Sequence, residues 1–272
     1  MKFGENETEK EHVTVEKELI RFDLRKGSPE PLKDQVVAEG QVELYIGGSH
    51  HTTFLCSISQ AKELAVGHLV TEGLINKPED ITSLEVGRGE VHVNLTKKLA
   101  ARLQGKPQLI LTSCGSRGLK IPPRIWMNAR RASADLSIRL NPQTILKAIV
   151  ELNSRALTFR RTGGSHAAAL LDDDGEVLAF SEDIGRHNAI DKVIGEAILK
   201  GIDLRRSFLA STGRLTSEMV VKAVYAGVPV IVSISAPTDN AIKIAEMAGL
   251  TLIGFARGKR FNIYAHHDKV LF

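Results

Sequence analysis

Cysteine is scarce in this sequence. The 272 residues include only Cys56 and Cys114, which lie far apart. Two cysteines cannot form the disulfide framework of a small secreted protein, and they cannot build a thiolate-rich zinc site. The His-His pairs at 50–51 and 266–267 lack the spacing of ligands on one helix face, and the zinc-deaminase signature is missing. We therefore expect a cytoplasmic protein with no intrinsic metal.

Long apolar runs and a strong charge of one sign are also missing. No apolar run approaches the roughly 20 residues that cross a bilayer, and residues 1–18 lack the apolar centre of a secretory signal. The formal net charge is only +4, and no dense Lys/Arg stripe with interleaved aromatic residues is present. We expect neither a membrane nor a nucleic acid as a partner, although a mildly basic chain can accept an anionic ligand.

The first half of the chain predicts short strands around one helix. Two β-favouring runs flank Gly47-Gly48 and predict a hairpin, and a second pair of strands is expected at 81–86 and 90–95. A helix is expected to start with Ser59 as its N-cap and to end near Gly73. A weak strand after residue 18 is expected to be broken at Glu30-Pro31.

The second half predicts alternating strands and helices. Strands at 208–211, 228–233 and 251–255 alternate with helices that end at Gly227 and Gly249, a pattern typical of βαβ units around a buried parallel sheet. A hairpin is expected at 167–171 and 177–180, a strand at 156–160, and a helix capped by Asn188. We divide the chain into a flexible lead (1–18), an α+β domain (19–125) and an α/β domain (126–272).

Cys114 follows a short apolar run and precedes small, flexible residues. Nearby Arg117 and Lys120 favour the thiolate, which is the nucleophilic form of cysteine. Two interpretations stay open at this point: a reactive thiol on a loop, or a small residue at a tight turn.

Three loops are expected to meet at the carboxyl ends of the parallel strands, at 211–214, 235–239 and 255–260. Helix N-termini, hydroxyl groups and guanidinium groups suit phosphate, so the set favours a nucleotide-like ligand. Each loop taken singly is more typical of residues that only end or cap a helix.

The segment 181–192 is the densest polar stretch, and His166 can join it. It can supply acid–base groups, or it can be a solvated helix start with a His187–Asp191 pair.

Taken together, these motifs resemble the FdhD family of formate dehydrogenase accessory sulfurtransferases. The resemblance runs from about residue 36 to the C-terminus. The segments that carry it are 65–69 (AVGHL), 72–75 (EGLI), 112–115 (TSCG), 162–166 (TGGSH), 182–192 (EDIGRHNAIDK), 211–214 (STGR) and 255–257 (FAR).

The resemblance implies an α/β fold, with a three-layer C-terminal domain like that of cytidine deaminases and a smaller, strand-rich α+β N-terminal domain. It implies a cytoplasmic homodimer that takes persulfide sulfur from a cysteine desulfurase on Cys114. That sulfur would pass to the molybdenum cofactor, bis-molybdopterin guanine dinucleotide, for formate dehydrogenase. The residues expected to bind this guanine-nucleotide-containing cofactor are Phe255, Ala256, Arg257, Gly258, Lys259, Arg260, Thr212, Gly213, Arg214, His166 and His187.

The sequence departs from the family at one position. The family usually reads C-G-x-C-G, and this chain has Arg117 in place of the second cysteine. A two-thiol relay within this loop is therefore ruled out, while single-cysteine transfer remains chemically feasible. Cys56 lies in an apolar run and is expected to be a core residue. The alternatives are a non-catalytic, cofactor-binding chaperone and, less favoured, a nucleotide-processing enzyme.

Overall fold

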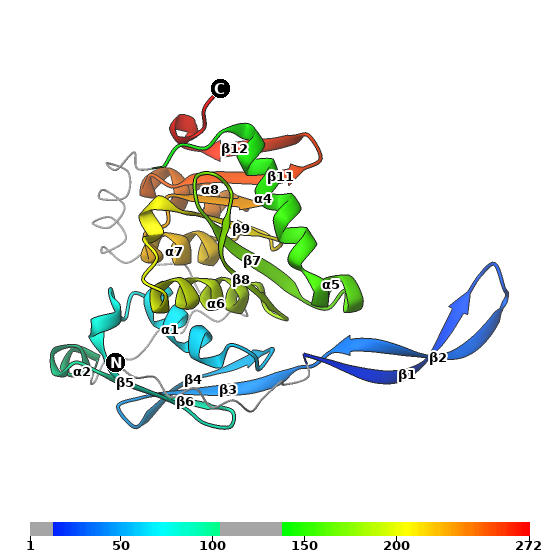
Figure 1. Cartoon of the computed structure of the whole chain (residues 1–272), viewed down its shortest axis with the longest axis horizontal. Helices are drawn as coiled ribbons and strands as arrows, with labels where there is room; N and C mark the ends of the chain where they lie inside the picture. The colour runs from blue at the N-terminus through cyan, green and yellow to red at the C-terminus, as the bar shows by residue number, and fades with distance from the viewer. Residues whose placement is uncertain (1–12, 104–137) are drawn as a thin grey trace.

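The computed structural model describes residues 13–103 and 138–272 and has the predicted α/β fold (Figure 1). Its centre is a six-stranded sheet in the order β12-β11-β10-β9-β7-β8. The three strands β9, β10 and β11 are parallel, as predicted, whereas β7, β8 and β12 pair antiparallel with their neighbours, so the sheet is mixed. The bounds are β7 (His166–Leu171), β8 (Val177–Asp183), β9 (Phe208–Ser211), β10 (Val230–Ser233), β11 (Thr251–Arg257) and β12 (Arg260–Ala265).

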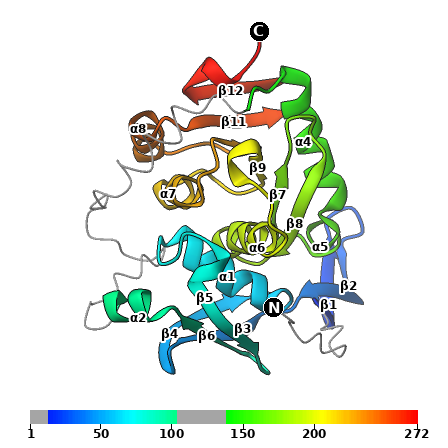
Figure 2. The same ribbon diagram turned by 60° about the vertical axis from the view of Figure 1, so that its left-hand side comes forward.

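Helices cover both faces of this sheet and make it the middle of three layers, as Figure 2 shows. One face carries α6 (Arg186–Leu199), α7 (Ser217–Ala226) and α8 (Asp239–Ala248), and the other carries α4 (Pro142–Arg155). Leu209 packs on the first side, while Phe208 and Ala210 pack on the second. Because both faces are buried, the central strands are continuous apolar runs rather than alternating ones.

The smaller, strand-rich part packs beneath α6 through helix α1 (Ala61–Thr71). Its four-stranded sheet has the order β4-β3-β6-β5. A Cβ on Gly67 would overlap the carbonyl oxygen of Asp191, and one on Gly195 would overlap that of Glu63. These glycines let α1 and α6 touch backbone to backbone, so one hydrophobic core continues through both parts. The elements are β3 (Gly40–Ile46), β4 (Ser49–Cys56), β5 (Ile81–Val86), β6 (Glu90–Leu95) and α2 (Lys97–Leu103).

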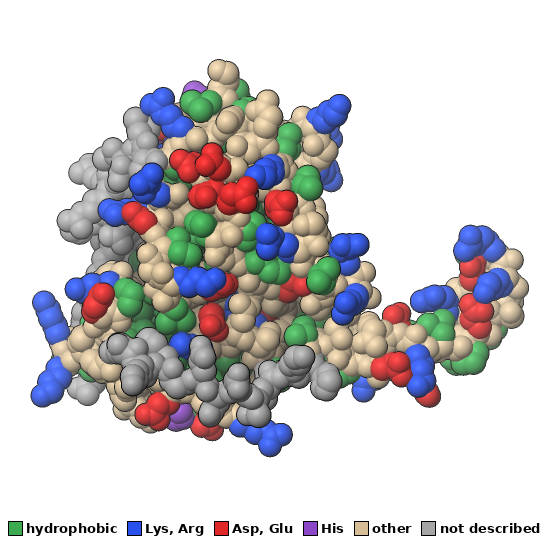
Figure 3. All heavy atoms as spheres, viewed as in Figure 1, with side chains coloured by type: hydrophobic (Ala, Val, Ile, Leu, Met, Phe, Trp, Pro, Cys, Tyr) green, Lys and Arg blue, Asp and Glu red, His purple; other side chains and the backbone are tan. Residues whose placement is uncertain are grey.

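A two-stranded arm, β1 (Thr14–Asp23) with β2 (Ser28–Val37), projects from the body (Figures 1 and 3). Two sequence-based expectations are corrected here. The end of the predicted flexible lead lies in β1, and the expected break at Glu30-Pro31 lies inside β2. Both strands of the arm are edge strands, where a proline does not interrupt a sheet ladder.

Three secondary-structure predictions also need correction. The strand expected at 156–160 is instead helix α5 (Leu157–Thr162), because the Glu182 carboxylate accepts hydrogen bonds from the backbone N–H groups of Thr158 and Phe159, each at 2.8 Å. Helix α6 begins at Arg186, and Asn188 lies within its first turn. Helix α1 begins at Ala61, after Gln60 in the left-handed region.

The remaining predictions concern Cys56, the domain boundary, the loop of Cys114 and membrane-spanning helices. Cys56 is fully buried in β4, as predicted. The boundary at 125/126 and the loop of Cys114 lie outside the described residues. Within the two described stretches, no helix is long and apolar enough to cross a membrane.

Candidate functional site

The loops after β9, β10 and β11 meet at one edge of the sheet, as the sequence predicted. The Ser235 hydroxyl donates to the carbonyl oxygen of Thr212 at 3.0 Å, and the Phe255 N–H donates to the carbonyl oxygen of Ser235 at 3.1 Å. Because β7 runs antiparallel to β9, His166 at its start reaches the same edge. Ser235 is therefore the bridge between the loop of Thr212 and the loop of Phe255.

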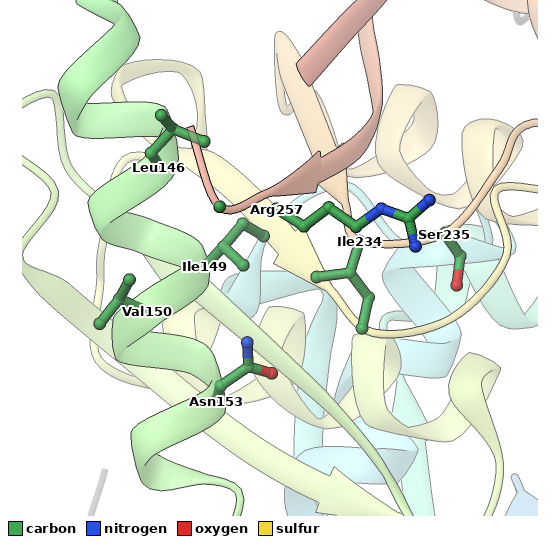
Figure 4. Close-up of a pocket in the computed structure, with 8 residues that line it drawn as sticks. Leu146, Ile149, Val150, Asn153, Ile234, Ser235 and Arg257 are labelled. Carbon is green, nitrogen blue, oxygen red and sulfur yellow. The ribbon is translucent and has the colours of Figure 1, made fainter. Parts of the chain in front are cut away.

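A pocket of about 380 Å³ opens at this edge between α4 and the ends of β10 and β11. Figure 4 shows the Arg257 side chain running across the pocket toward Ser235, with Ile149 of α4 pointing toward it from the other side. One wall is thus apolar and the other carries a guanidinium group and a hydroxyl group. The lining residues are Leu146, Ile149, Val150, Asn153, Ile234, Ser235, Arg257 and Gly258.

The end of β11 departs from regular strand geometry. Phe255 has φ 52°, in the left-handed region that non-glycine residues seldom adopt, and the pairing with β12 shifts between Gly254 and Arg257. The Arg257 guanidinium lies 5.4 Å from the centre of the Phe255 ring. Such strain is concentrated at ligand sites.

The six predicted binding residues at the end of β11 do not share one environment. Arg257, Gly258, Lys259 and Arg260 are exposed at the β11–β12 turn, whereas Ala256 is fully buried among the core residues on the α4 side. Ala256 can therefore position its neighbours, and its own side chain does not face the pocket edge.

His166, Thr212 and Gly213 form the next part of the edge. His166 Nδ1 lies 3.3 Å from Thr212 Oγ1, which also accepts a hydrogen bond from the N–H of Ala167 at 3.0 Å. Burial lowers the pKa of His166, and the positive charge of Arg186 lowers it further. His166 is therefore a neutral side chain beside a cation near pH 7.

Arg186 is the main edge residue that we did not predict, although it lies in the polar segment 181–192. Its Nε is buried and has no hydrogen-bond partner. Burial lowers the pKa of Arg186, and the charge of Arg214 lowers it further. The charge of Glu218 acts in the opposite direction and raises the pKa of Arg186 in part. The signal in the sequence that could have identified Arg186 was its place at the start of a helix, among other polar residues.

His187 lies under this edge rather than in it. Its Nε2 is 3.0 Å from Glu218 Oε2, and its side chain is 19% exposed. Burial, followed by the charges of Arg186 and Lys222, lowers the pKa of His187 to about 4. The predicted His187–Asp191 pair is wrong, because Asp191 turns to α7 and α1 instead.

Asp191 belongs to a buried charge network between α1, α6 and α7. Lys222 Nζ lies 2.9 Å from Asp191 Oδ2 and 3.0 Å from both Thr71 Oγ1 and Glu72 Oε1. Burial by itself would raise the pKa of Asp191, but the charge of Lys222 and the hydrogen bonds of His68 and Thr71 lower it overall. This network was not predicted, because its members are far apart in the sequence.

A second buried pair joins Lys192 to Asp183 at 2.7 Å, with both side chains fully buried. Asp183 also accepts from the N–H groups of Ser57 and Gly185. The polar segment 181–192 therefore has two roles. Asp183, Asp191 and Lys192 hold α6 in place, and Arg186 faces the sheet edge.

Cys114, the predicted sulfur-bearing residue, lies outside the described residues, as do Arg117 and Lys120. In the parts of the chain that the structure describes, no three His, Cys, Asp or Glu side chains are grouped as metal ligands would be.

Comparison with known proteins gives consistent results. Residues 37–271 match the model of the FdhD/NarQ family. A relative from Staphylococcus haemolyticus, named Sulfur carrier protein FdhD, is 36% identical over 93% of this chain and 95% of its own length. Proteins of the same name from Methanothermobacter thermautotrophicus and Bacillus subtilis are 35% and 31% identical, over 88% and 95% of this chain and over 92% and 98% of their own lengths.

The fold also has a solved counterpart. A crystal structure of a protein assigned as a formate dehydrogenase accessory protein, from Desulfotalea psychrophila, superposes with a TM-score of 0.76. It covers 95% of this chain and all of its own chain, at 23% identity. At that identity the likeness establishes the fold.

Proposed function

Because the chain belongs to the FdhD/NarQ family, we propose that it is a sulfur carrier protein that supports a formate dehydrogenase. In this proposal Cys114 carries the sulfur, and the molybdenum cofactor is the substrate that receives it. The observation that carries the ligand part is the sheet edge, where Arg186, Arg214 and Arg257 have no ion-pair partner among the described residues.

The acceptance step needs one nucleophilic thiolate. The Cys114 thiolate attacks the outer sulfur of a persulfide on a cysteine desulfurase. A new S–S bond forms on Cys114, the S–S bond of the donor breaks, and the donor cysteine leaves as a thiolate. No net electrons are consumed in this exchange, which is ordinary thiol–disulfide chemistry.

The delivery step needs a second thiol from another molecule, because Arg117 stands where the family has its second cysteine. If that thiol attacks the Sγ atom of the Cys114 persulfide, the S–S bond of the persulfide breaks and the outer sulfur leaves as sulfide. A mixed disulfide between Cys114 and the attacking thiol remains. The two electrons come from the attacking thiol. The role of Cys114 is therefore that of a single-thiol carrier.

The sheet edge supports a nucleotide-containing substrate. Guanidinium groups bind phosphate oxygens with two parallel hydrogen bonds, and the pocket beside Arg257 has one apolar wall against which a ring can lie. A guanine dinucleotide cofactor has both kinds of group. A homodimer in the cytoplasm belongs to the same proposal, and light scattering on the purified protein tests the dimer.

Intact-mass measurement tests the sulfur step directly. The protein is incubated with a cysteine desulfurase and cysteine, and an adduct of about 32 Da that a reductant removes is expected. Cys114→Ala should abolish the adduct, while the matched variant Cys56→Ala should keep it, because Cys56 is buried. Absence of the adduct on the wild-type protein, or its survival in Cys114→Ala, contradicts the proposal.

A non-catalytic chaperone that only binds the cofactor is the second candidate, and the missing second cysteine favours it. This candidate predicts that cells with Cys114→Ala keep formate dehydrogenase activity, whereas cells with Arg257→Gln lose it. Loss of activity in Cys114→Ala, with normal protein levels, rules it out.

A further inference from the structure

The arm formed by β1 and β2 projects away from the rest of the chain. Each of its strands has ten residues, and Figure 1 shows the outer half of the arm standing clear of the other described elements. A two-stranded ribbon by itself is only marginally stable in water. Almost all of the arm precedes residue 37, where the match to the family model begins, so the family match does not explain it.

One face of the outer half of the arm is apolar. In the antiparallel pairing Ile20 lies opposite Pro31 and Phe22 lies opposite Pro29, and residues paired in this way point to the same face. All four side chains are exposed, and Leu24 at the tip is 89% exposed. We name these five residues the arm patch. A contiguous apolar patch with a polar rim is typical of a protein–protein contact surface.

Charged side chains around the arm patch pair with one another. Lys26 Nζ lies 2.9 Å from Glu30 Oε2, and Lys33 Nζ lies 2.9 Å from Glu16 Oε1. Because these charges are balanced within the arm, the patch offers apolar contact and little net charge. A protein surface with exposed apolar side chains matches it, whereas an anionic ligand does not.

A surface of that kind lies on α4 and α5, beside the base of the arm. Val150 of α4 and Leu157 and Phe159 of α5 are exposed, and we name them the body patch. Figure 3 shows apolar side chains on this side of the body, above the base of the arm. A Cβ on Gly164, just after α5, would lie 2.6 Å from Cγ1 of Val37, so the base of the arm packs here. The arm leads away from this surface, and its own tip does not cover the body patch.

We infer that the arm patch of one copy packs on the body patch of a second copy, in a two-fold exchange of arms. The inference rests on the homodimer of the proposed function. Ten residues at about 3.3 Å each give the arm a reach of about 33 Å. Because each arm starts beside its own body patch, two arms that run side by side in opposite directions bring each tip to the other copy's patch.

The contact area favours a second copy over an unrelated partner. One face of a two-stranded ribbon of this length covers roughly 300 Å², so one arm contact buries roughly 600 Å² on both surfaces together. Stable interfaces bury about 1,200 Å² or more, and the two-fold arrangement reaches this area because the contact occurs twice. Val150 also lines the pocket of Arg257, so in this arrangement the arm of one copy borders the pocket of the other.

Sedimentation equilibrium of the full chain, over a series of concentrations, measures the dissociation constant of the dimer. Phe22→Glu and Leu157→Lys should each raise this constant by about a hundredfold or more, because the new charge enters both apolar contacts of the symmetric dimer. Leu55→Glu is the matched control. Leu55 is 57% exposed on a strand of the four-stranded sheet, against 56% for Phe22, and its replacement should leave the constant unchanged.

A mixture of the Phe22→Glu and Leu157→Lys proteins tests the exchange itself. In the mixed dimer one contact joins a carboxylate to an ammonium group, and the other is the native apolar contact. Dimers should therefore form again, with a dissociation constant within about tenfold of the wild-type value. Recovery also shows that both variants are folded. A mixture that stays monomeric overturns the inference.

The remaining outcomes separate this inference from the proposed function. A dimer that neither substitution weakens overturns the exchange of arms and leaves the homodimer in place. A wild-type protein that is monomeric at every concentration overturns both the exchange and the homodimer. The mass adduct on Cys114 does not depend on the arm, so the sulfur-carrier proposal is tested separately.

Discussion

Charged side chains on the two sides of the first turns of helix α6 have opposite surroundings. Toward the interior, Asp191 and Lys192 are fully buried, and each contacts a partner of opposite charge: Lys222 of α7 for Asp191, and Asp183 of β8 for Lys192. Toward the sheet edge, Arg186 forms no ion pair among the described residues; burial and then the charge of Arg214 lower its pKa, and the charge of Glu218, which contacts His187, raises it in part. Only four residues separate Arg186 from Asp191 in the sequence.

The difference teaches which charges hold the fold and which are available to a ligand. A buried charge is tolerated only when it is paired and hydrogen-bonded, so the inner network is a structural device. An unpaired charge at a partly open edge raises the energy of the empty protein and lowers the energy of a complex with an anion. The inner pairs should therefore control stability, and the outer arginines should control binding.

The most direct test of this difference removes one cation from each side of α6. Lys222→Met leaves Asp191 buried without its main partner and should lower the free energy of unfolding by about 3–5 kcal/mol. Arg214→Met is the matched control, and it should change stability by less than about 0.5 kcal/mol, because Arg214 is exposed. Urea denaturation measures both, and similar losses in the two variants would contradict the division.

The pH dependence of stability tests the protein interior through His51, a side chain that burial keeps neutral. Burial, followed by the charge of His68, lowers the pKa of His51 from 6.5 to about 4. Between these two values the unfolded chain binds the proton and the folded chain does not. Stability from this group is therefore complete above about pH 6.5 and is lost as the pH falls toward 4, by about 2 kcal/mol once partial solvation is allowed for.

His51→Phe should flatten the pH dependence of stability over this range, measured as urea midpoints at several pH values. His187 shifts in the same direction, but the Glu218 carboxyl, whose pKa burial raises, takes up a proton in the folded protein and offsets part of its effect. His51 is the cleaner group for this reason. An unchanged slope in His51→Phe would show that the interior does not exclude its proton.

Gly213→Ala sharpens the comparison at the outer side. The added Cβ would lie 2.8 Å from the Cβ of Arg186 and must push that residue aside, at a cost of about 1–2 kcal/mol in stability. Affinity for pyrophosphate, a probe for the diphosphate of the proposed cofactor, should fall several-fold at the same time. Gly87→Ala is the matched control, because a Cβ there has its nearest neighbour at 3.8 Å. Equal effects in the two variants would argue against the contact.

The smallest expected effect belongs to the Ser235 bridge between the loop of Thr212 and the loop of Phe255. Ser235→Ala removes the hydrogen bond to the carbonyl oxygen of Thr212 and should cost about 1 kcal/mol. Ser154→Ala, on the exposed side of α4, should cost less than half of that. A thermal-unfolding series resolves the difference, and no difference would mean that the loops are held together without Ser235.

Much of this architecture could be predicted from the sequence. Glycines after helices and continuous apolar runs located β9, β10, β11, α7 and α8, because these signals depend on neighbouring residues alone. Corrections were needed where a distant side chain decides the local structure. Residues 157–162 form a helix because Glu182 satisfies its first N–H groups, and this partner lies more than 20 residues away.

The sequence by itself determined the family, the alternation of strands and helices, and the meeting of three loops at one sheet edge, since strand ends in a parallel sheet meet there whatever the packing. Only the tertiary structure decided which polar residues of 181–192 are structural and which face a ligand. That choice depends on the direction in which α6 presents each side chain, and the close contact of Gly67 with Gly195 sets it. The same contact brings α1 against α6, turns Asp191 toward Lys222, and leaves Arg186 at the edge with Arg214.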